Sequence, residues 1–459
     1  MARADGSALT PDAADDAAAA AARPAVAGTP RDPHEASRAA VEAVWRIESA
    51  RIVGALARWT GDFPLAEDLA QQALAEALES WPGDGVPANP GGWLLTVGRR
   101  RGIDGFRRRA ALDERYAALA HGLREGELVS SSGGPETQDG LDALLPDSDE
   151  IDDDVLALVF IACHPVLSAE ARVALTLRVV AGLTTDEIAR AFLVPSATVQ
   201  ARITRAKKTL AAAKVPFELP APDERPQRLG GVLSVLYVVF TEGSTATAGD
   251  DLLRVDLARE ALRLARVLSR LLPAEPEVHG LLALMELTAA RFPARTGPDG
   301  AAVGLQDQDR RLWDRAAVAR GQAALARAVQ VGRGLGPYGL QAAIASCHAA
   351  APSVEATDWE RIVLLYEALG RVAPSPVVEL NRAVAVAMLH GPLTALAIVD
   401  ELAAGGRLAA SHLLPSVRGE LLARLGRPTE ARAELLRAAE LTTNRREREL
   451  LERKAADLA

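Results

Sequence analysis

Apolar residues recur at every third or fourth position through most of this chain, the pattern of amphipathic helices. Between residues 39 and 119 the pattern predicts three helices. The first ends near residues 61–62, and the second covers residues 65–81. Its predicted buried stripe consists of Leu65, Leu69, Ala73 and Leu78. A loop rich in proline and glycine is expected over residues 82–92, and the third helix is expected to begin at Trp93.

Residues 180–210 predict two short helices joined by a tight turn. Thr184 and Glu187 have the spacing of a capping box, so the first helix should start there. Pro195 interrupts it because proline cannot continue the hydrogen-bond ladder. Ser196 can then cap a second helix, whose inward residues are Val199, Ile203 and Leu210. The pattern favours a helix-turn-helix, whose second helix enters a DNA major groove. A basic surface hairpin without a ligand is the alternative.

Amphipathic helices continue from residue 228 to the end. Residues 359–392 and 412–441 look like helix hairpins, and Gly426 follows Gly391 by 35 residues. This spacing favours tetratricopeptide-like repeats, with irregular helical packing as the alternative. A polar loop over residues 292–312 interrupts the helices. Its charged residues indicate a structural ion-pair network more than a partner site; they are Asp307, Asp309, Arg310 and Arg311.

Composition supports an all-α chain, because aromatic residues make up only 4% and alanine and leucine dominate. Cys163 and Cys347 lie far apart without a CxxC spacing, which is typical of a reduced, cytoplasmic protein without disulfides or a zinc site. We expect Cys163 and His164 to lie in the core at a helix end. The sequence contains no apolar run of membrane-spanning length and no nucleophile, phosphate-loop or metal motif, so we expect neither an enzyme nor a cofactor.

Charge divides the chain into five parts. Residues 1–37 read as a disordered tail, 38–121 as a first module, and 122–154 as a flexible linker with eleven acids against Arg124 alone. Residues 155–215 form a second module and 228–459 a helical third. The net charge of −9 therefore does not exclude nucleic acid. Residues 99–109 contain six arginines and one acid, Asp104. This excess of positive charge is typical of a surface that binds phosphates.

The two modules suit different forms of DNA. In the helix-turn-helix, glutamine pairs with adenine and arginine with guanine, so Gln200, Arg202 and Arg205 are candidate base readers. Lys207 and Lys208 are candidates for phosphate contacts. In the first module, arginines beside tryptophans suit single-stranded or melting DNA. For Trp81 and Trp93, packing in the core is the alternative.

Three ordered motifs resemble extracytoplasmic-function (group 4) sigma-70 factors. Residues 66–74, AEDLAQQAL, resemble region 2.2; residues 93–108 resemble regions 2.3 to 2.4; and residues 182–210 resemble region 4.2. The remaining half is similar to the subgroup with a long tetratricopeptide-like extension, including residues 236–243 and 306–310. Departures from the family pattern leave base preferences and docking strength open; they are Gln72, Leu74, Arg100 and Gln200.

The resemblance implies roles for named residues. Glu67, Asp68, Gln71 and Gln72 would dock on the β′ clamp helices of core RNA polymerase, whose β flap is a further expected contact. The loop over residues 82–92 would hold a flipped base of the −10 element. Contacts with the melted −10 strand would come from Trp93, Arg99, Arg100, Arg101, Arg107 and Arg108. Contacts with the −35 element would come from Ser196, Thr198, Gln200, Arg202, Arg205, Lys207 and Lys208.

The main hypothesis is therefore a non-enzymatic sigma factor that binds promoter DNA. We expect its C-terminal half to regulate it in cis or to bind a signalling protein, and we expect no membrane partner. A helix-turn-helix regulator that binds duplex DNA without polymerase is the alternative. A third hypothesis is a tetratricopeptide scaffold with vestigial DNA modules.

Overall fold

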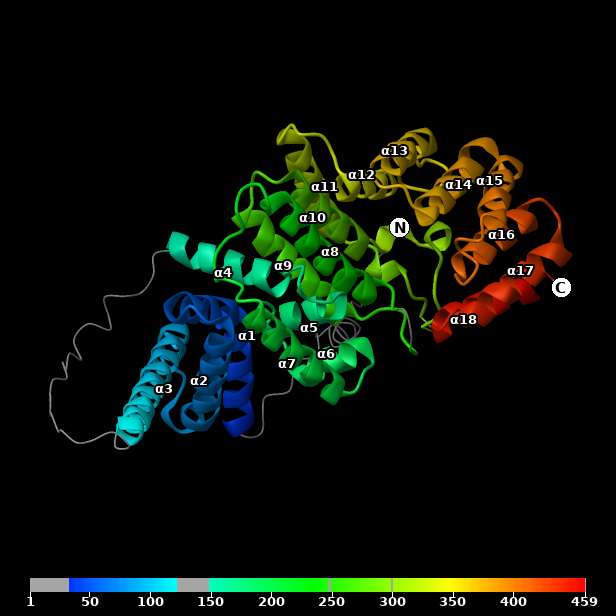
Figure 1. Cartoon of the computed structure of the whole chain (residues 1–459). Coiled ribbons are helices and arrows are strands. Elements are labelled where there is room, and N and C mark those ends of the chain that lie inside the picture. The colour runs from blue at the N-terminus through cyan, green and yellow to red at the C-terminus, as the bar shows by residue number, and fades with distance from the viewer. Residues whose placement is uncertain (1–32, 122–147, 247–248, 299, 459) are drawn as a thin grey trace, which may run out of the picture.

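The computed structural model describes residues 33–121, 148–246, 249–298 and 300–458 (Figure 1). Within these ranges the chain is helical and forms no β-strand, which confirms the all-α fold. The helices are α1 (Pro33–Thr60), α2 (Phe63–Asp84), α3 (Pro90–His121), α4 (Ser148–Ala162), α5 (Ala169–Val179), α6 (Thr185–Phe192), α7 (Ser196–Ala212), α8 (Arg225–Ser244), α9 (Val255–Leu271), α10 (Pro276–Ala289), α11 (Arg315–Gln330), α12 (Pro337–Ala350), α13 (Trp359–Val372), α14 (Pro376–His390), α15 (Pro392–Ala404), α16 (Leu413–Arg424), α17 (Pro428–Leu441) and α18 (Arg445–Ala456). Three short 3₁₀ turns are η2 (Phe292–Ala294), η3 (Leu305–Asp307) and η4 (Arg310–Leu312).

Helices α1, α2 and α3 form a bundle at one end of the molecule (Figure 1). A β-carbon built on Gly102 of α3 would lie 2.6 Å from the indole of Trp59, so glycine permits the close approach of α1 and α3. Leu69 and Ala73 are buried in α2 as expected, but Leu78 is 39% exposed and its expected burial is wrong. The buried stripe instead continues through Ala77 and Trp81.

The loop between α2 and α3 is shorter than the sequence suggested. Helix α2 runs through Pro82 to Asp84, because so late in the helix proline removes only one hydrogen bond of the ladder. Helix α3 begins at Pro90 rather than Trp93, and the side chain of Asn89 accepts a hydrogen bond from the amide of Gly92 at 3.0 Å. Proline fits the first helical position because its missing N–H has no partner there. Only residues 85–89 remain outside the helices.

Helix α4 begins inside the segment that we expected to be a linker. Residues 148–154 form its first turns, while residues 122–147 lie outside the described ranges. Asp154 is 5% exposed and forms an ion pair with Arg58 of α1 at 3.4 Å. A β-carbon on Gly54 of α1 would lie 3.0 Å from the Asp154 side chain, so α4 lies directly on α1. The last part of the acidic segment is therefore packed structure. At the other boundary, the described part of the predicted tail, residues 33–37, begins α1.

The helix-turn-helix consists of α6 and α7. The capping box of Thr184 and Glu187 is present, with both reciprocal hydrogen bonds, as predicted. Leu193 ends α6 in the left-handed conformation with a φ of 51°. The expected Ser196 cap is wrong: α7 has Pro195 at its N-cap position, and the Ser196 hydroxyl donates to Asp186 at 2.6 Å instead. The inward residues of α7 are buried as expected; they are Val199, Ile203 and Leu210.

Helices α8 to α12 fill the centre of the molecule, and α13 to α18 form an arc beside them (Figure 1). Each helix of the arc packs on the next one in the chain. Between the two predicted hairpins lies α15, which the sequence reading did not assign. In the loop before α11, Asp309 and Arg311 pair at 2.7 Å. Buried Arg310 donates to the carbonyl oxygens of His348 and Ala351, which gives this loop a structural role.

One continuous hydrophobic core extends through α1 to α10, and a second lies within α12 to α17. The first core joins residues from the arginine-rich module, the helix-turn-helix and the central helices. The placement of these modules, which the sequence left open, is therefore set by shared apolar packing among the described residues.

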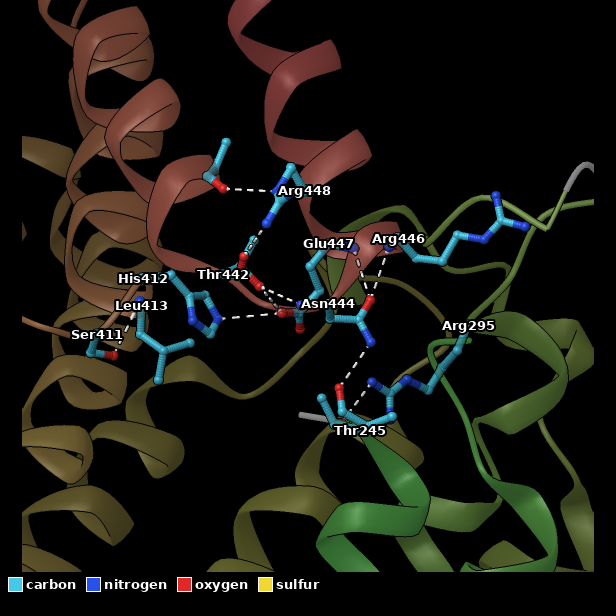
Figure 2. A network of polar contacts seen from close by, with 12 residues as sticks. Thr245, Arg295, Ser411, His412, Leu413, Thr442, Asn444, Arg446, Glu447 and Arg448 are labelled. Carbon is cyan, nitrogen blue, oxygen red and sulfur yellow. Dashed lines mark hydrogen bonds and ion pairs between the residues drawn. The ribbon is translucent and has the colours of Figure 1, made fainter. Parts of the chain in front are cut away.

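A loop between α8 and α9 links the arc to the helix-turn-helix. Fully buried Asn444, which caps α18, donates from Nδ2 to the carbonyl oxygens of Ala246 and Asp251. Figure 2 shows this cap beside Thr245, which follows α8, and Arg295, which follows η2. From the same loop, Arg254 donates to the carbonyl oxygen of Ala191 in α6. The far end of the chain is thus linked to the helix-turn-helix through the described residues of this loop.

Candidate nucleic-acid and polymerase interface

The four candidate docking residues of α2 differ in exposure. Asp68 and Gln72 are exposed and Gln71 is half-buried, whereas Glu67 is 2% exposed. The sequence placed Glu67 off the buried stripe of α2. Its burial is caused by side chains from α5 and α7, which cover this face of the helix.

Two cations from the second module contact this face. The Lys207 ammonium on α7 donates to Glu67, and to Asp68 at 2.9 Å. Arg178 on α5 donates to the Gln71 side-chain oxygen at 2.6 Å, and its Nε lies 3.8 Å from a Glu67 oxygen. Candidate DNA-binding and polymerase-binding residues therefore contact each other directly.

The carboxylates of Glu67 and Asp68 stabilise the charged form of Lys207. Burial alone lowers the pKa of an ammonium group, but the carboxylates of Glu67 and Asp68 raise the pKa of Lys207 above its ordinary value. Lys207 is therefore positively charged at neutral pH. A buried carboxylate next to a buried ammonium is stable only while both remain together.

A second set of contacts continues the interface toward α1. Arg46 donates to Glu187, the acid of the capping box. Gly182 has a φ of +73°, and a β-carbon there would lie 2.7 Å from the Ser49 hydroxyl. Because burial is offset by the Thr184 hydrogen bonds and by Arg46, the pKa of Glu187 lies below its ordinary value. The start of the helix-turn-helix therefore lies tightly against α1.

Only some of the candidate DNA-binding residues of α7 are exposed to solvent. Ser196, Gln200, Arg205 and Lys208 are exposed, while Thr198, Arg202 and Lys207 are half-buried. Gln200 accepts a weak hydrogen bond from Thr185 at 3.4 Å. Arg202 lines a cavity of about 240 Å³ between the helix-turn-helix and α8. Of the three candidate base readers, Gln200 and Arg205 are therefore exposed and Arg202 is half-buried.

The arginine helix α3 is also divided. Arg100 and Arg101 are exposed but pair with Glu76 of α2, the latter at 2.8 Å. Arg107, Arg108 and Arg109 are exposed as well. Burial beside Arg58 lowers the pKa of the Arg99 guanidinium. The exposed charge that is not paired with Glu76 therefore lies at Arg107, Arg108 and Arg109.

The two tryptophans of the first module meet edge to face, with ring centroids 5.4 Å apart. Trp81 is 2% exposed, which agrees with the core-packing alternative, while Trp93 is half-buried.

Cys163 is buried just after α4, and burial raises its pKa to about 11, so its thiol is unreactive.

The sequence pattern did not predict that Arg46, Arg178 and Asp154 lie at this interface. Their partners lie 96 to 141 positions away in the chain, and Arg178 lies 107 positions from Gln71. No local spacing can signal such pairs. The sequence showed only that these three residues are charged and gave no indication of their partners.

Comparison with known families gives three matches. Residues 46–111 match the family described as Sigma-70 region 2, and residues 158–210 match Sigma-70, region 4. Residues 228–329 match a family of unknown function, DUF6596. No solved structure matches the chain significantly. In the described residues, no helix is both long and apolar enough to cross a membrane.

A relative is similar in sequence over most of this chain. The protein named "Uncharacterized protein R00370", from Rhizobium meliloti (strain 1021), is 46% identical over 394 residues, which covers 85% of this chain and 89% of that protein. The similarity therefore extends beyond the two sigma regions into the C-terminal half. The matches to regions 2 and 4 place this chain in the sigma-70 family, whose partners are core RNA polymerase and promoter DNA.

Proposed function

We propose that the chain is an extracytoplasmic-function (group 4) sigma factor that directs promoter-specific transcription initiation in the cytoplasm. The matches to regions 2 and 4 are separated by only 46 residues, which supports a factor built from these two regions. The observation that carries the proposal is a helix-turn-helix with exposed Gln200 and Arg205, in the same chain as a helix with exposed Arg107 and Arg108. Duplex reading and single-strand binding need these two different surfaces.

The residue roles follow from this proposal. Gln200 and Arg205 read the −35 element, with Lys208 on phosphates and Ser196 and Thr198 at the helix start. Arg202 and Lys207 join them once they are freed from their present contacts. Arg107 and Arg108 bind the melted −10 strand, together with Trp93, Arg99, Arg100 and Arg101. Glu67, Asp68, Gln71 and Gln72 dock on the β′ clamp helices, and region 4 meets the β flap.

The C-terminal half is proposed to be a tetratricopeptide-like regulatory domain. Helices α13, α15 and α17 begin at residues 359, 392 and 428, close to a 34-residue period. A cavity of about 330 Å³ is lined by Trp359, Tyr366 and Arg424, together with residues from other helices of the arc. Its size suits part of a signalling partner, and Asn444 connects the arc to the helix-turn-helix through the loop at residues 246–254.

Transcription with purified core polymerase tests the function. A genomic fragment library is transcribed with and without the full chain, and start sites are mapped. We expect new start sites that share two upstream elements. The Gln200→Ala/Arg205→Ala variant should lose them, whereas Lys214→Ala, in the turn after α7, serves as the matched control. No chain-dependent start site on any fragment would refute the proposal.

The alternative is a duplex-binding regulator that works without polymerase. Capture of core polymerase by the immobilised chain distinguishes the two. A sigma factor is retained with polymerase through region 2, so Gln72→Ala, at an exposed docking residue, should reduce capture and leave duplex binding unchanged. Duplex binding without any capture favours the regulator.

A further inference from the structure

We propose that the described arrangement is a closed state in which region 4 covers the polymerase-docking face of region 2. This inference rests on the proposed function and concerns the regulation of the same site. The face that a polymerase helix would need is occupied by side chains of the chain itself. The surface therefore has an internal partner, the basic side of α5 and α7.

Burial supports this inference directly. The Glu67 side chain is 3% exposed, and that of Lys207, which covers it, is 19% exposed. Asp68 is 63% exposed but shares the same ammonium group. A partner cannot reach the Glu67 carboxylate until α7 moves away. A partner that takes this face must also replace the interaction that Lys207 provides, because a buried carboxylate left unpaired is strongly destabilising.

The same contact restricts DNA binding. Lys207 belongs to the recognition helix, and its charge is directed into α2 rather than toward phosphates. Arg178 adds a hydrogen bond to Gln71, so two docking candidates besides Asp68 are engaged. One rearrangement thus frees both a polymerase surface and a DNA contact, which couples the two binding events.

A neighbouring contact identifies where the closed state can be locked. Ser49 is 1% exposed, and its hydroxyl has no hydrogen-bond partner among the described residues. It faces Gly182, where a β-carbon would lie 2.7 Å away from it. Cysteines at both positions bring their sulfurs within bonding reach, since bridged β-carbons lie about 3.8 Å apart. Neither residue belongs to the proposed docking or DNA-binding sets.

Closure predicts a measurable reduction in affinity. When only a fraction of molecules is open, the apparent dissociation constant for polymerase rises by the inverse of that fraction. Locking the interface should therefore weaken polymerase capture, and loosening it should strengthen capture. Arg46→Ala removes one half-exposed ion pair to Glu187 and should strengthen capture by up to about 5-fold, the range of surface ion pairs.

The test uses the full-length Ser49→Cys/Gly182→Cys variant. Mass spectrometry under non-reducing conditions first measures whether the bridge forms. Capture of core polymerase is then compared before and after dithiothreitol. We expect bridge formation, capture at least about 10-fold weaker when oxidised, and recovery on reduction. The reduced variant has the same sequence, so it controls for strain at the positive φ of residue 182, and Ser49→Cys alone controls for oxidation.

The outcomes separate the two proposals. A variant that folds but forms no bridge overturns the closed state without involving polymerase. A bridge that leaves capture unchanged overturns the inhibitory role. Bridge formation with no capture by wild type or by the reduced variant refutes the proposed function instead, and the inhibitory role with it. A cooperative thermal transition of the reduced variant shows that the chain has folded.

Discussion

Lys207 of the recognition helix donates to Glu67 of α2, and this contact joins two residues 140 positions apart at the centre of the interface between regions 2 and 4. Both side chains are largely shielded from water, so neither charge is well solvated without the other. This contact explains why Glu67 is buried, although the apolar pattern of α2 places it off the buried stripe.

Removing Lys207 should therefore reveal an energetic coupling. Lys207→Ala is expected to lower the free energy of unfolding by about 1–3 kcal/mol, because it leaves the Glu67 carboxylate largely unpaired. The Lys207→Ala/Glu67→Ala double variant should lose less than the sum of the single effects. Urea denaturation measures each value. Lys208→Ala, on the exposed neighbour, is the control and should stay within about 0.5 kcal/mol of wild type. Strict additivity of the two substitutions would contradict the coupling.

Arg205 and Lys208 should differ in how they bind duplex DNA. Arg205→Ala is expected to weaken binding by about 1–3 kcal/mol and to relax discrimination at one base pair, as for arginine on guanine. Lys208→Ala should weaken binding equally for all sequences and reduce the salt slope by about 1. Fluorescence anisotropy at several salt concentrations, with a selected duplex and its single-base variants, measures both. Sequence-independent loss from Arg205→Ala would exclude it as a base reader.

Glu76 restrains part of the arginine helix. Its pKa lies below its ordinary value, because Arg101 and Arg100 outweigh the opposing effect of burial. Glu76→Gln should release both arginines and strengthen single-stranded DNA binding by about 2- to 5-fold, the range of exposed ion pairs. Glu79→Gln removes the same charge from the exposed side of α2 and is the matched control. Equal effects of both substitutions would show that only net charge matters.

His348 should make the C-terminal helices sensitive to acid. Burial, together with Arg291 and Arg310, lowers its pKa from 6.5 to about 4. Between these values the unfolded chain binds a proton that the folded chain does not, so stability present above pH 6.5 falls as the pH falls toward 4. At pH 5 the loss is on the order of 2 kcal/mol. Thermal unfolding at pH 7.5 and pH 5 measures it, and His348→Gln should reduce the difference. An unchanged difference would place the acid sensitivity elsewhere.

Asn444 should be essential to the joint between the arc and the centre. Its amide donates to Ala246 and Asp251, and its Oδ1 accepts from the amides of Arg446 and Glu447 (Figure 2). Asn444→Ala is expected to cost about 2–4 kcal/mol, from a lost helix cap and two buried carbonyls left without donors. Asn444→Asp keeps the cap but cannot donate, so it separates the two effects. Urea denaturation measures both variants; a loss below about 1 kcal/mol would contradict this role.

The sequence by itself determined the features that depend on near neighbours. The helical period gave the all-α fold, and the capping box of Thr184 and Glu187 was readable because both partners lie within one turn. The turn at Leu193 and the inward face of α7 were likewise local. The arginine excess of α3 and the three family motifs needed no tertiary information.

Only the tertiary structure decided which charged residues are free. Glu67 and Asp154 are buried because residues from distant segments pack on them, and Leu78 is exposed because none of the described helices covers it. Local spacing has no information on such pairs, since burial is a property of the whole packed chain. The sequence therefore specified two DNA-binding modules, whereas packing across the shared core decided that they face each other.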